Sequence, residues 1–383
     1  MKNQKIKSLV VFETFKILFV ILISLNILFA QSKTVIDTTQ IISEFQENRE
    51  LLPPDSLLQN EAFLEEDSVR TITPILSLPQ GESPEGIAID YSGNIFISNT
   101  KGENRSINEI LRVEPNGTST VFATLPGKGR ALGLVTDLRG SIYVAFGTED
   151  SITNGVYRID RNGIPIHLAG SEQMGFPNSL TFDDLGNLYA TDSYKGENFE
   201  GAVWCYNKNE KRFKLLIKHP LLDGGVPPNG PPFPLPGANG IAFFPPNKLY
   251  VANTKQSSII RITIGEFGNE PTIELVKKDS LLLNIDGIVV DKHENIYGVL
   301  PPSTLGALGA PPVPPLVKLD TKSGVVSSVI EDNSKFDTPT SLAFRKTVNG
   351  VNLFITNAAL QYGQPPSAGP GVVKVKVDSL VSY

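Results

Sequence analysis

Apolar residues in this chain recur in short alternating runs rather than with the period of a helix. Residues 84–100 are typical: an alternating run, a Gly-Asn turn, and a second run rich in β-branched and aromatic residues. This pattern predicts strands joined by tight turns. Further runs follow, such as residues 110–113 and 119–125, so each such unit predicts four consecutive strands.

The unit occurs six times. A Gly or Ser marks the same position in every copy, and these residues are Gly86, Gly133, Ser179, Gly240, Gly287 and Ser341. Their spacing of 46 to 61 residues, with four strands per unit, is typical of propeller blades. We therefore predict an all-β protein: a six-bladed β-propeller with four antiparallel strands in each blade.

The chain ends predict how the ring closes. The sixth unit has a third strand at residues 372–377 but little chain after it, whereas residues 71–78 form an extra strand-like run before the first unit. We predict that these two strands pair in one sheet, which closes the ring and removes an exposed edge.

The residues before the first unit differ in character. Lys2, Lys5 and Lys7 precede an apolar run at residues 17–29 and small residues from Ala30, which is the pattern of a secretory signal peptide at 1–30. The alternative is an uncleaved N-terminal anchor. Residues 31–69 are acidic and are interpreted as a solvated linker or arm, and 70–383 as the propeller. We expect a secreted or periplasmic protein with no stable membrane span after cleavage.

Composition narrows the classes of function. The chain carries a net charge of −6, and since residues 1–30 contribute +3, the remainder carries −6 − 3 = −9, which argues against nucleic acid as a partner. A single Cys excludes a disulfide framework and a Cys-based zinc site. P-loop, dinucleotide-fingerprint and G-x-S-x-G motifs are absent from the sequence. We expect a monomer that acts on a small molecule.

Strand alternation places the long Pro- and Gly-rich connections on one rim of the ring. They include residues 101–108, 195–201, 223–237, 301–315 and 361–371. Proline makes such loops stiff, and stiff loops over one mouth of a propeller predict a roofed pocket. The simpler alternative is that the insertions are merely tolerated.

The residue before each repeated Gly or Ser begins the innermost strand and is expected to point at the axis on that same rim. These residues are Glu85, Leu132, Asn178, Asn239, Asp286 and Thr340. Two carboxylates and two amides among them are oxygen ligands of the kind that Ca²⁺ prefers, whereas zinc and copper favour His or Cys. We predict that Glu85, Asn178, Asn239 and Asp286 bind Ca²⁺ or another divalent cation. The alternative is that these Asn and acidic residues only bond to local backbone.

This arrangement resembles the senescence-marker-protein/gluconolactonase (regucalcin-like) family over about residues 72–383, and more loosely the paraoxonase arylesterases and strictosidine synthases. Pro177-Asn178, Asn239-Gly240 and Asp286-Gly287 correspond to the second, third and fourth ligand motifs of that family. The resemblance implies a divalent metal, typically Ca²⁺, held at the axis by Glu, Asn, Asn and Asp. It also implies that Asp286 is the catalytic general base.

The acidic ligand has two candidates. Residues 81–84 match the G-E-S-P string of the family, which would make Glu82 the ligand. Glu85, however, precedes Asn99 by 14 residues, as Asn178 precedes Asp192. We choose Glu85 and keep Glu82 as the alternative.

The sequence also departs from the family. Regucalcin-like enzymes have a sugar-binding Arg two residues before the first Asn ligand, where this chain has Phe176. Phe233, Leu305 and Tyr362 in the Pro-rich loops add further apolar groups. We therefore expect these four residues to line a pocket for a ligand less polar than a sugar lactone.

The resulting hypothesis is an exported, divalent-metal-dependent hydrolase of the lactonase/esterase type, which acts on a small ester or lactone at the propeller axis. The alternative, from another class, is a non-catalytic propeller that binds a ligand or a protein around a structural Ca²⁺. A propeller fold alone does not decide between them.

Overall fold

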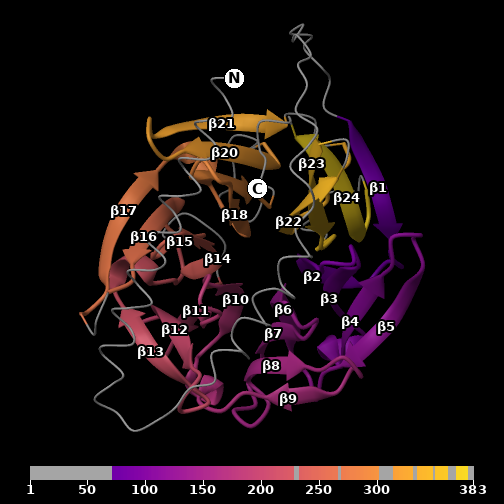
Figure 1. The fold of residues 1–383 in the computed structure, drawn as a ribbon, viewed down its shortest axis with the longest axis horizontal. Helices are drawn as coiled ribbons and strands as arrows, with labels where there is room; N and C mark the ends of the chain where they lie inside the picture. Colours follow the sequence, from indigo (N-terminus) through magenta and orange to yellow (C-terminus); the bar gives the residue numbers. More distant parts are fainter. Residues whose placement is uncertain are drawn as a thin grey trace, which may run out of the picture. The chain divides into compact units, whose positions relative to one another are not determined.

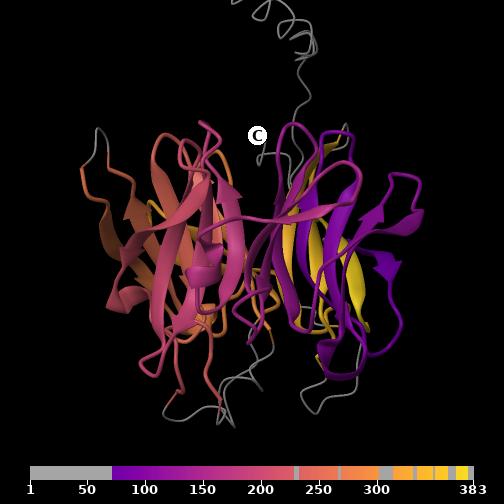
Figure 2. The ribbon, with the colours of Figure 1, turned by 90° about the horizontal axis from the view of Figure 1, so that it is seen from below.

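The computed structural model describes residues 71–227, 233–265, 269–301, 314–330, 334–347, 350–360 and 368–377. Within these residues, 24 strands form six four-stranded antiparallel sheets. Figure 1 shows the sheets as blades around a central axis, and Figure 2 shows the same ring from the side. The predicted six-bladed propeller is therefore confirmed. The signal peptide and the acidic arm predicted at 1–30 and 31–69 lie outside the described residues.

Each of the first three blades is built from consecutive strands. Blade 1 contains β2 (Ser83–Ile89), β3 (Ile95–Lys101), β4 (Ile107–Val113) and β5 (Ser119–Thr124). Blade 2 contains β6 (Arg130–Thr136), β7 (Ile142–Gly147), β8 (Gly155–Ile159) and β9 (Pro165–His167). Blade 3 contains β10 (Pro177–Phe182), β11 (Leu188–Lys195), β12 (Glu200–Asn207) and β13 (Arg212–Lys218).

The remaining blades complete the ring. Blade 4 contains β14 (Ala238–Phe244), β15 (Lys248–Asn253), β16 (Ser258–Thr263) and β17 (Thr272–Lys278). Blade 5 contains β18 (Ile288–Val290), β19 (Asn295–Val299), β20 (Leu316–Asp320) and β21 (Val325–Ile330). Blade 6 contains β22 (Pro339–Thr347), β23 (Gly350–Asn357), β24 (Gly371–Val377) and β1 (Ile72–Ser77). Short 3-10 turns lie at Glu103–Arg105, Ser171–Gln173, Pro220–Leu222 and Ser280–Leu282.

Blade 6 confirms the predicted closure. β1, the first described strand, pairs antiparallel with β24, the last one, with Ile72 opposite Val375 and Ser77 opposite Gly371. Apolar side chains of β1 pack into two clusters, Ile72 with blades 5 and 6, and Ile75 and Leu76 with blades 1 and 6. The two ends of the described chain therefore share one sheet.

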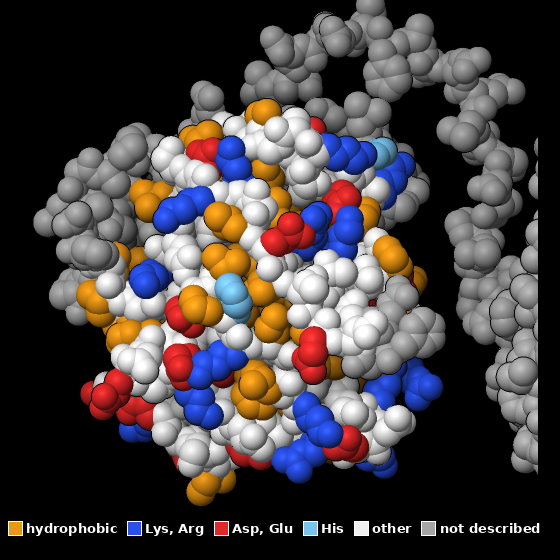
Figure 3. Space-filling model, turned by 90° about the vertical axis from the view of Figure 1, so that its left-hand side faces the viewer, with side chains coloured by type: hydrophobic (Ala, Val, Ile, Leu, Met, Phe, Trp, Pro, Cys, Tyr) orange, Lys and Arg blue, Asp and Glu red, His pale blue; other side chains and the backbone are white. Residues whose placement is uncertain are grey.

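The core lies between neighbouring blades. Between blades 1 and 2, for example, Phe96 of β3 packs with Ile142 and Phe146 of β7. These side chains are almost completely buried. The outer wall is different: Figure 3 shows acidic and basic side chains interspersed on one side of it. Arg261 of β16 and Glu274 of β17 form a cross-strand ion pair, 2.6 Å apart. Charged residues on the outer strands protect the edges of the blades from pairing with other chains. Among the described residues, no helix is long and apolar enough to cross a membrane.

Around the axis the innermost strands approach one another so closely that side chains are excluded. A Cβ on Gly86 would lie 2.5 Å from the Leu132 carbonyl oxygen, and one on Gly240 would lie 2.4 Å from that of Asp286. Gly133 and Gly287 make the same approach to the next blade. The repeated glycine is therefore required because its neighbour's backbone occupies the space of a side chain.

Where the repeated residue is Ser, a threonine hydroxyl joins the blades instead. Thr191 accepts a hydrogen bond from the Ser179 N–H (2.9 Å) and donates one to the Asn239 carbonyl oxygen in blade 4 (2.7 Å). Thr356 bonds in the same way to the Ser341 N–H and the Glu85 carbonyl oxygen, across the junction between blades 6 and 1.

Removing β1 should destabilise the ring. A chain that starts at Ser77 loses the pairing with β24 and the packing of three aliphatic side chains, each contributing about 1–2 kcal/mol when partly buried. We expect its free energy of unfolding to be lower by about 3 kcal/mol or more than that of a chain starting at Thr71. Denaturant titration measures the difference, and equal midpoints for the two chains would disprove the closing role of β1.

The close approach at the axis predicts a cost for the smallest added side chain. Gly240→Ala places a methyl group against the backbone of blade 5, so we expect it to lower the free energy of unfolding by about 1–3 kcal/mol. Ser179→Ala at the equivalent position of blade 3 is the matched control, with an expected change below about 1 kcal/mol. Chemical denaturation of both variants is the measurement. If Gly240→Ala is as stable as the control, the backbone contact is not limiting.

Candidate functional site

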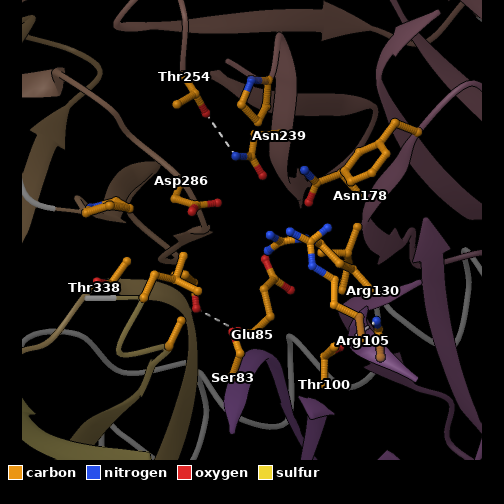
Figure 4. Close-up of a pocket in the computed structure, with 18 of the residues that line it drawn as sticks. Ser83, Glu85, Thr100, Arg105, Arg130, Asn178, Asn239, Thr254, Asp286 and Thr338 are labelled. Carbon is orange, nitrogen blue, oxygen red and sulfur yellow. Dashed lines mark hydrogen bonds between the residues drawn. The ribbon is translucent and has the colours of Figure 1, made fainter. Parts of the chain in front are cut away.

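A cavity of about 770 Å³ opens at the propeller axis. All six residues expected to point at the axis line it: Glu85, Leu132, Asn178, Asn239, Asp286 and Thr340. In five of the six innermost strands the pairing with the second strand slips at this residue, as between Pro177 and Leu180. Such β-bulges re-aim a side chain. Figure 4 shows Glu85, Asn178, Asn239 and Asp286 facing one another across the cavity.

The hydrogen bonds of the two amides fix the direction of their oxygens. Asn178 Nδ2 lies 2.9 Å from Ser193 Oγ, and that hydroxyl donates its one proton to the Ala238 carbonyl oxygen (2.8 Å). The hydroxyl can therefore only accept from the amide, so the NH₂ group faces it and the carbonyl oxygen faces the axis.

Asn239 has the same arrangement one blade later. Its Nδ2 donates to Thr254 Oγ1 (2.9 Å), which donates to the Ile285 carbonyl oxygen (2.7 Å). Both amides therefore present acceptor oxygens to the cavity. Asn178 Oδ1 is buried and has no hydrogen-bond partner among the described residues.

The two carboxylates lie together in the axial cavity, and both residues are partly buried. Burial raises the pKa of Glu85 well above its ordinary value, and the nearby Asp286 raises it further, while Arg130 acts in the opposite direction. Burial likewise raises the pKa of Asp286, against a smaller lowering effect of the Asn239 amide. Glu85 Oε2 also lacks a hydrogen-bond partner among the described residues. Two partly buried acids and two amide oxygens that face the cavity form a donor set that fits a hard divalent cation.

Glu82 does not lie at the axis. Its Oε2 accepts a hydrogen bond from Asn99 Nδ2 (2.6 Å), its Oε1 lies 3.8 Å from Lys101 Nζ, and it is not among the residues that line the cavity. Of the two candidates for the acidic ligand, the structure places Glu85 with Asn178, Asn239 and Asp286. Within the described residues, no cluster of three or more His, Cys, Asp or Glu side chains is placed to hold a metal ion.

No protein-family model matches the sequence, and no curated protein matches it. Among solved structures, a gluconolactonase from Xanthomonas campestris aligns with a TM-score of 0.56 at 17% identity, over 80% of this chain and 89% of that one. A calcium-binding protein, regucalcin, from Agrobacterium tumefaciens strain C58 aligns with a TM-score of 0.54 at 17% identity, over 80% of this chain and 93% of that one.

The chain has the fold of the gluconolactonase and regucalcin propellers. A structural genomics protein of unknown function from Bacteroides thetaiotaomicron shares it, with a TM-score of 0.55 and 16% identity over 81% of this chain and 76% of that one. Since a shared fold does not fix an activity, function has to be argued from the site.

A second tier of residues lies next to the axial ring. In five blades the residue two positions before the axial one also lines the cavity, and these residues are Ser83, Arg130, Phe176, Asn284 and Thr338. Blade 4 has Gly237 there, where a Cβ would collide with the Leu222 carbonyl oxygen. Sequence reasoning identified Phe176 in this tier but missed Arg130, although the same repeat position would have located it.

The predicted apolar lining is present in part. Phe176 and Phe233 line the cavity, and Phe176 stacks on Tyr194 with ring centroids 5.2 Å apart and an 11° interplanar angle. Leu305 and Tyr362 lie outside the described residues. Tyr194 and Arg105 also line the cavity. Neither residue was expected at the site. Tyr194 lies near the end of β11, beyond the part of the strand that repeats between blades, and Arg105 lies in the loop between β3 and β4, which has no counterpart in the repeat.

Asp192, within β11, holds the segment that carries Phe176. Its carboxylate accepts hydrogen bonds from the N–H groups of Gly175 (2.9 Å) and Phe176 (2.8 Å), and from Trp204 Nε1 (3.3 Å). Burial raises the pKa of Asp192 to about 6, and these hydrogen bonds act against the rise.

The raised pKa predicts a pH-dependent stability. Because an unfolded Asp titrates near pH 3.9, the folded protein binds more protons than the unfolded one between about pH 4 and 6. The Asp192 contribution to the free energy of unfolding is therefore lost as the pH rises through this window. Relative to Asp192→Asn, we expect the unaltered protein to lose up to about 3 kcal/mol between pH 4 and 7. Denaturant titrations at both pH values test this, and a difference that stays constant would contradict it.

Proposed function

We propose that the protein is an exported, divalent-metal-dependent hydrolase of the lactonase/esterase type, with Ca²⁺ as its ion. The observation that carries the proposal is the hydroxyl network that turns the Asn178 and Asn239 oxygens toward the cavity that the Glu85 and Asp286 carboxylates line. The gluconolactonase and the calcium-binding regucalcin with the same fold support it. Signal-peptide-like residues 1–30 support export.

The proposed hydrolysis gives the oxygen-bearing and the aromatic residues of the cavity different roles. Glu85, Asn178, Asn239 and Asp286 would hold the cation, which supplies positive charge to polarise an ester carbonyl and to acidify water. Asp286 would also accept the proton of the attacking water. The water oxygen then bonds to the carbonyl carbon, the acyl C–O bond breaks, and the proton passes to the leaving alkoxide. Phe176, Tyr194 and Phe233 would pack against the apolar part of the substrate.

The test is a panel of lactones and aryl esters, assayed with purified protein in the presence of Ca²⁺ and after chelation. We expect turnover that is lost on chelation and restored by Ca²⁺. Asp286→Asn should lower kcat by about 10²–10⁴-fold, the usual contribution of a general base. Asp184→Asn, the same change at an exposed turn, is the control and should retain activity.

Calcium binding measured by calorimetry separates the alternatives. Asn178→Ala should weaken it, since an amide oxygen of the ring is lost. Ca²⁺ binding without turnover across the panel would favour the non-catalytic propeller that binds a ligand or a protein around a structural ion. No divalent-cation binding at all would overturn both versions of the metal site.

A further inference from the structure

Two arginines share one side of the cavity. Arg130 begins β6, in the tier of Phe176 and one blade earlier, while Arg105 comes from the loop between β3 and β4. Figure 4 shows both side chains reaching toward the centre of the cavity beside Glu85. Two like charges in one cavity repel each other, and a nearby anion offsets that repulsion. Glu85 is such an anion for Arg130, which acts to lower the pKa of Glu85.

The backbone holds the two arginines together. The Arg105 carbonyl oxygen accepts a hydrogen bond from the N–H of Gly129, the residue next to Arg130, at 3.2 Å. Asn108 Nδ2 donates a second bond to the same oxygen, also at 3.2 Å. Arg105 itself has a left-handed backbone with φ of 56°, which is uncommon for a residue other than glycine. The loop is thus fixed in a conformation that brings Arg105 to the start of β6.

The charges that line the cavity favour an anionic ligand. Its described acids are Glu85 and Asp286, and its described cations are Lys101, Arg105 and Arg130. Lys101 is held by Glu109, with Nζ 2.8 Å from Oε2. A divalent cation would balance the two carboxylates, so the loaded cavity would carry a net positive charge from its arginines. Guanidinium groups bind carboxylates by paired, charge-assisted hydrogen bonds.

An aromatic surface adjoins the arginines. Tyr194, stacked on Phe176, lines the same cavity as Arg105 and Arg130. A ligand bound to the arginines can therefore also pack on the Phe176–Tyr194 stack. The cavity combines three features in one volume: an oxygen-lined axial ring, a paired cationic group and an apolar wall.

We propose that the substrate is an ester or lactone that carries a carboxylate beside an aromatic or other apolar group, with the carboxylate bound by Arg105 and Arg130 and the apolar group packed on Phe176 and Tyr194. This inference rests on the proposed hydrolase function, because it names the substrate class of that site. Its binding part does not require turnover and can be tested separately.

The binding test uses benzoate and benzamide, which have the same shape but differ in charge. Calorimetric titration into the Ca²⁺-loaded full chain should give benzoate about tenfold or greater preference, the range expected for charge-assisted hydrogen bonds. Arg105→Gln and Arg130→Gln should each weaken benzoate binding about five- to tenfold, and the double variant should abolish the preference. Benzamide affinity should stay within about twofold in all of them. Lys128→Gln, which removes an exposed positive charge two residues before Arg130, is the control.

Three results would overturn the arginine site. First, a benzoate preference that remains in the double variant directly contradicts the arginine site. A preference that disappears on chelation yet is unaffected by either arginine substitution shows that benzoate coordinates the ion only. An equal loss of benzoate and benzamide binding in the single variants shows a general loss of the cavity. Thermal melts and Ca²⁺ titrations of each variant show whether it is folded. If Arg130→Gln does not fold, Arg105→Gln, which changes an exposed residue, provides the decisive measurement.

Measurements of ester hydrolysis distinguish a failure of the proposed arginine site from a failure of the proposed hydrolase activity. Phenyl acetate and 4-acetoxybenzoate differ by one carboxylate, and the latter should have about tenfold higher kcat/KM, a ratio that falls toward one in the arginine variants. Hydrolysis of both esters with no such dependence would overturn the arginine site and leave the hydrolase. Benzoate selectivity that follows the arginines, without hydrolysis of any ester, would overturn the hydrolase and leave an anion-binding propeller.

Discussion

The close approach of neighbouring blades around the axis is the constraint on which the rest of the structure depends. Four blades place a glycine where the next blade's axial carbonyl oxygen leaves no room for a side chain. Two blades place a serine there and add a threonine hydroxyl that bonds to the same carbonyl of the next blade. Both solutions fix the backbone of the residue before the glycine or serine, and that residue carries the side chain at the axis. Ring geometry and ligand geometry are therefore set by the same contacts.

The hydroxyls couple stability to chemistry still more directly. Ser193 and Thr254 each donate their single proton to a carbonyl oxygen of the following blade. Because that proton is committed, each hydroxyl can only accept from the amide beside it, and Asn178 and Asn239 must direct their oxygens inward. A bond that joins two blades thus also decides which atom of an amide faces the cavity. Replacing such a hydroxyl would loosen a blade junction and release an amide at the same time.

Most of the fold could be predicted from the sequence, because each feature of the repeat has a structural cause in the packing or pairing of the blades. The glycine or serine, the strand alternation and the unit length together predicted six blades, the closing role of β1 and the six axial residues. The choice of Glu85 over Glu82 came from its spacing to Asn99, and the structure places Glu85 at the axis. What escaped was Arg105, since its place depends on a left-handed turn and on hydrogen bonds from Asn108 and Gly129 that no periodicity encodes. Arg130, in contrast, lies two residues before an axial position, as Phe176 does, so the repeat itself is sufficient to locate it.

The residues that line the cavity form two tiers, the axial residues and the residues two positions before them. Contacts between blades fix the backbone of the axial tier, whereas the second tier carries a different side chain in each blade. Axial residues sit at bulges locked by the neighbouring backbone, so an oxygen-bearing side chain there has little choice of direction. Residues two positions earlier also line the cavity in five blades, and their side chains differ from blade to blade: Ser83, Arg130, Phe176, Asn284 and Thr338. The regucalcin-like resemblance leads one to expect an arginine at the place of Phe176, and this chain has its arginine at the same position of the preceding blade. Since blades 2 and 3 are neighbours, Arg130 and Phe176 line adjacent parts of the cavity. The same position of two neighbouring blades therefore supplies a cationic group and an apolar wall, next to the oxygen-lined axial ring.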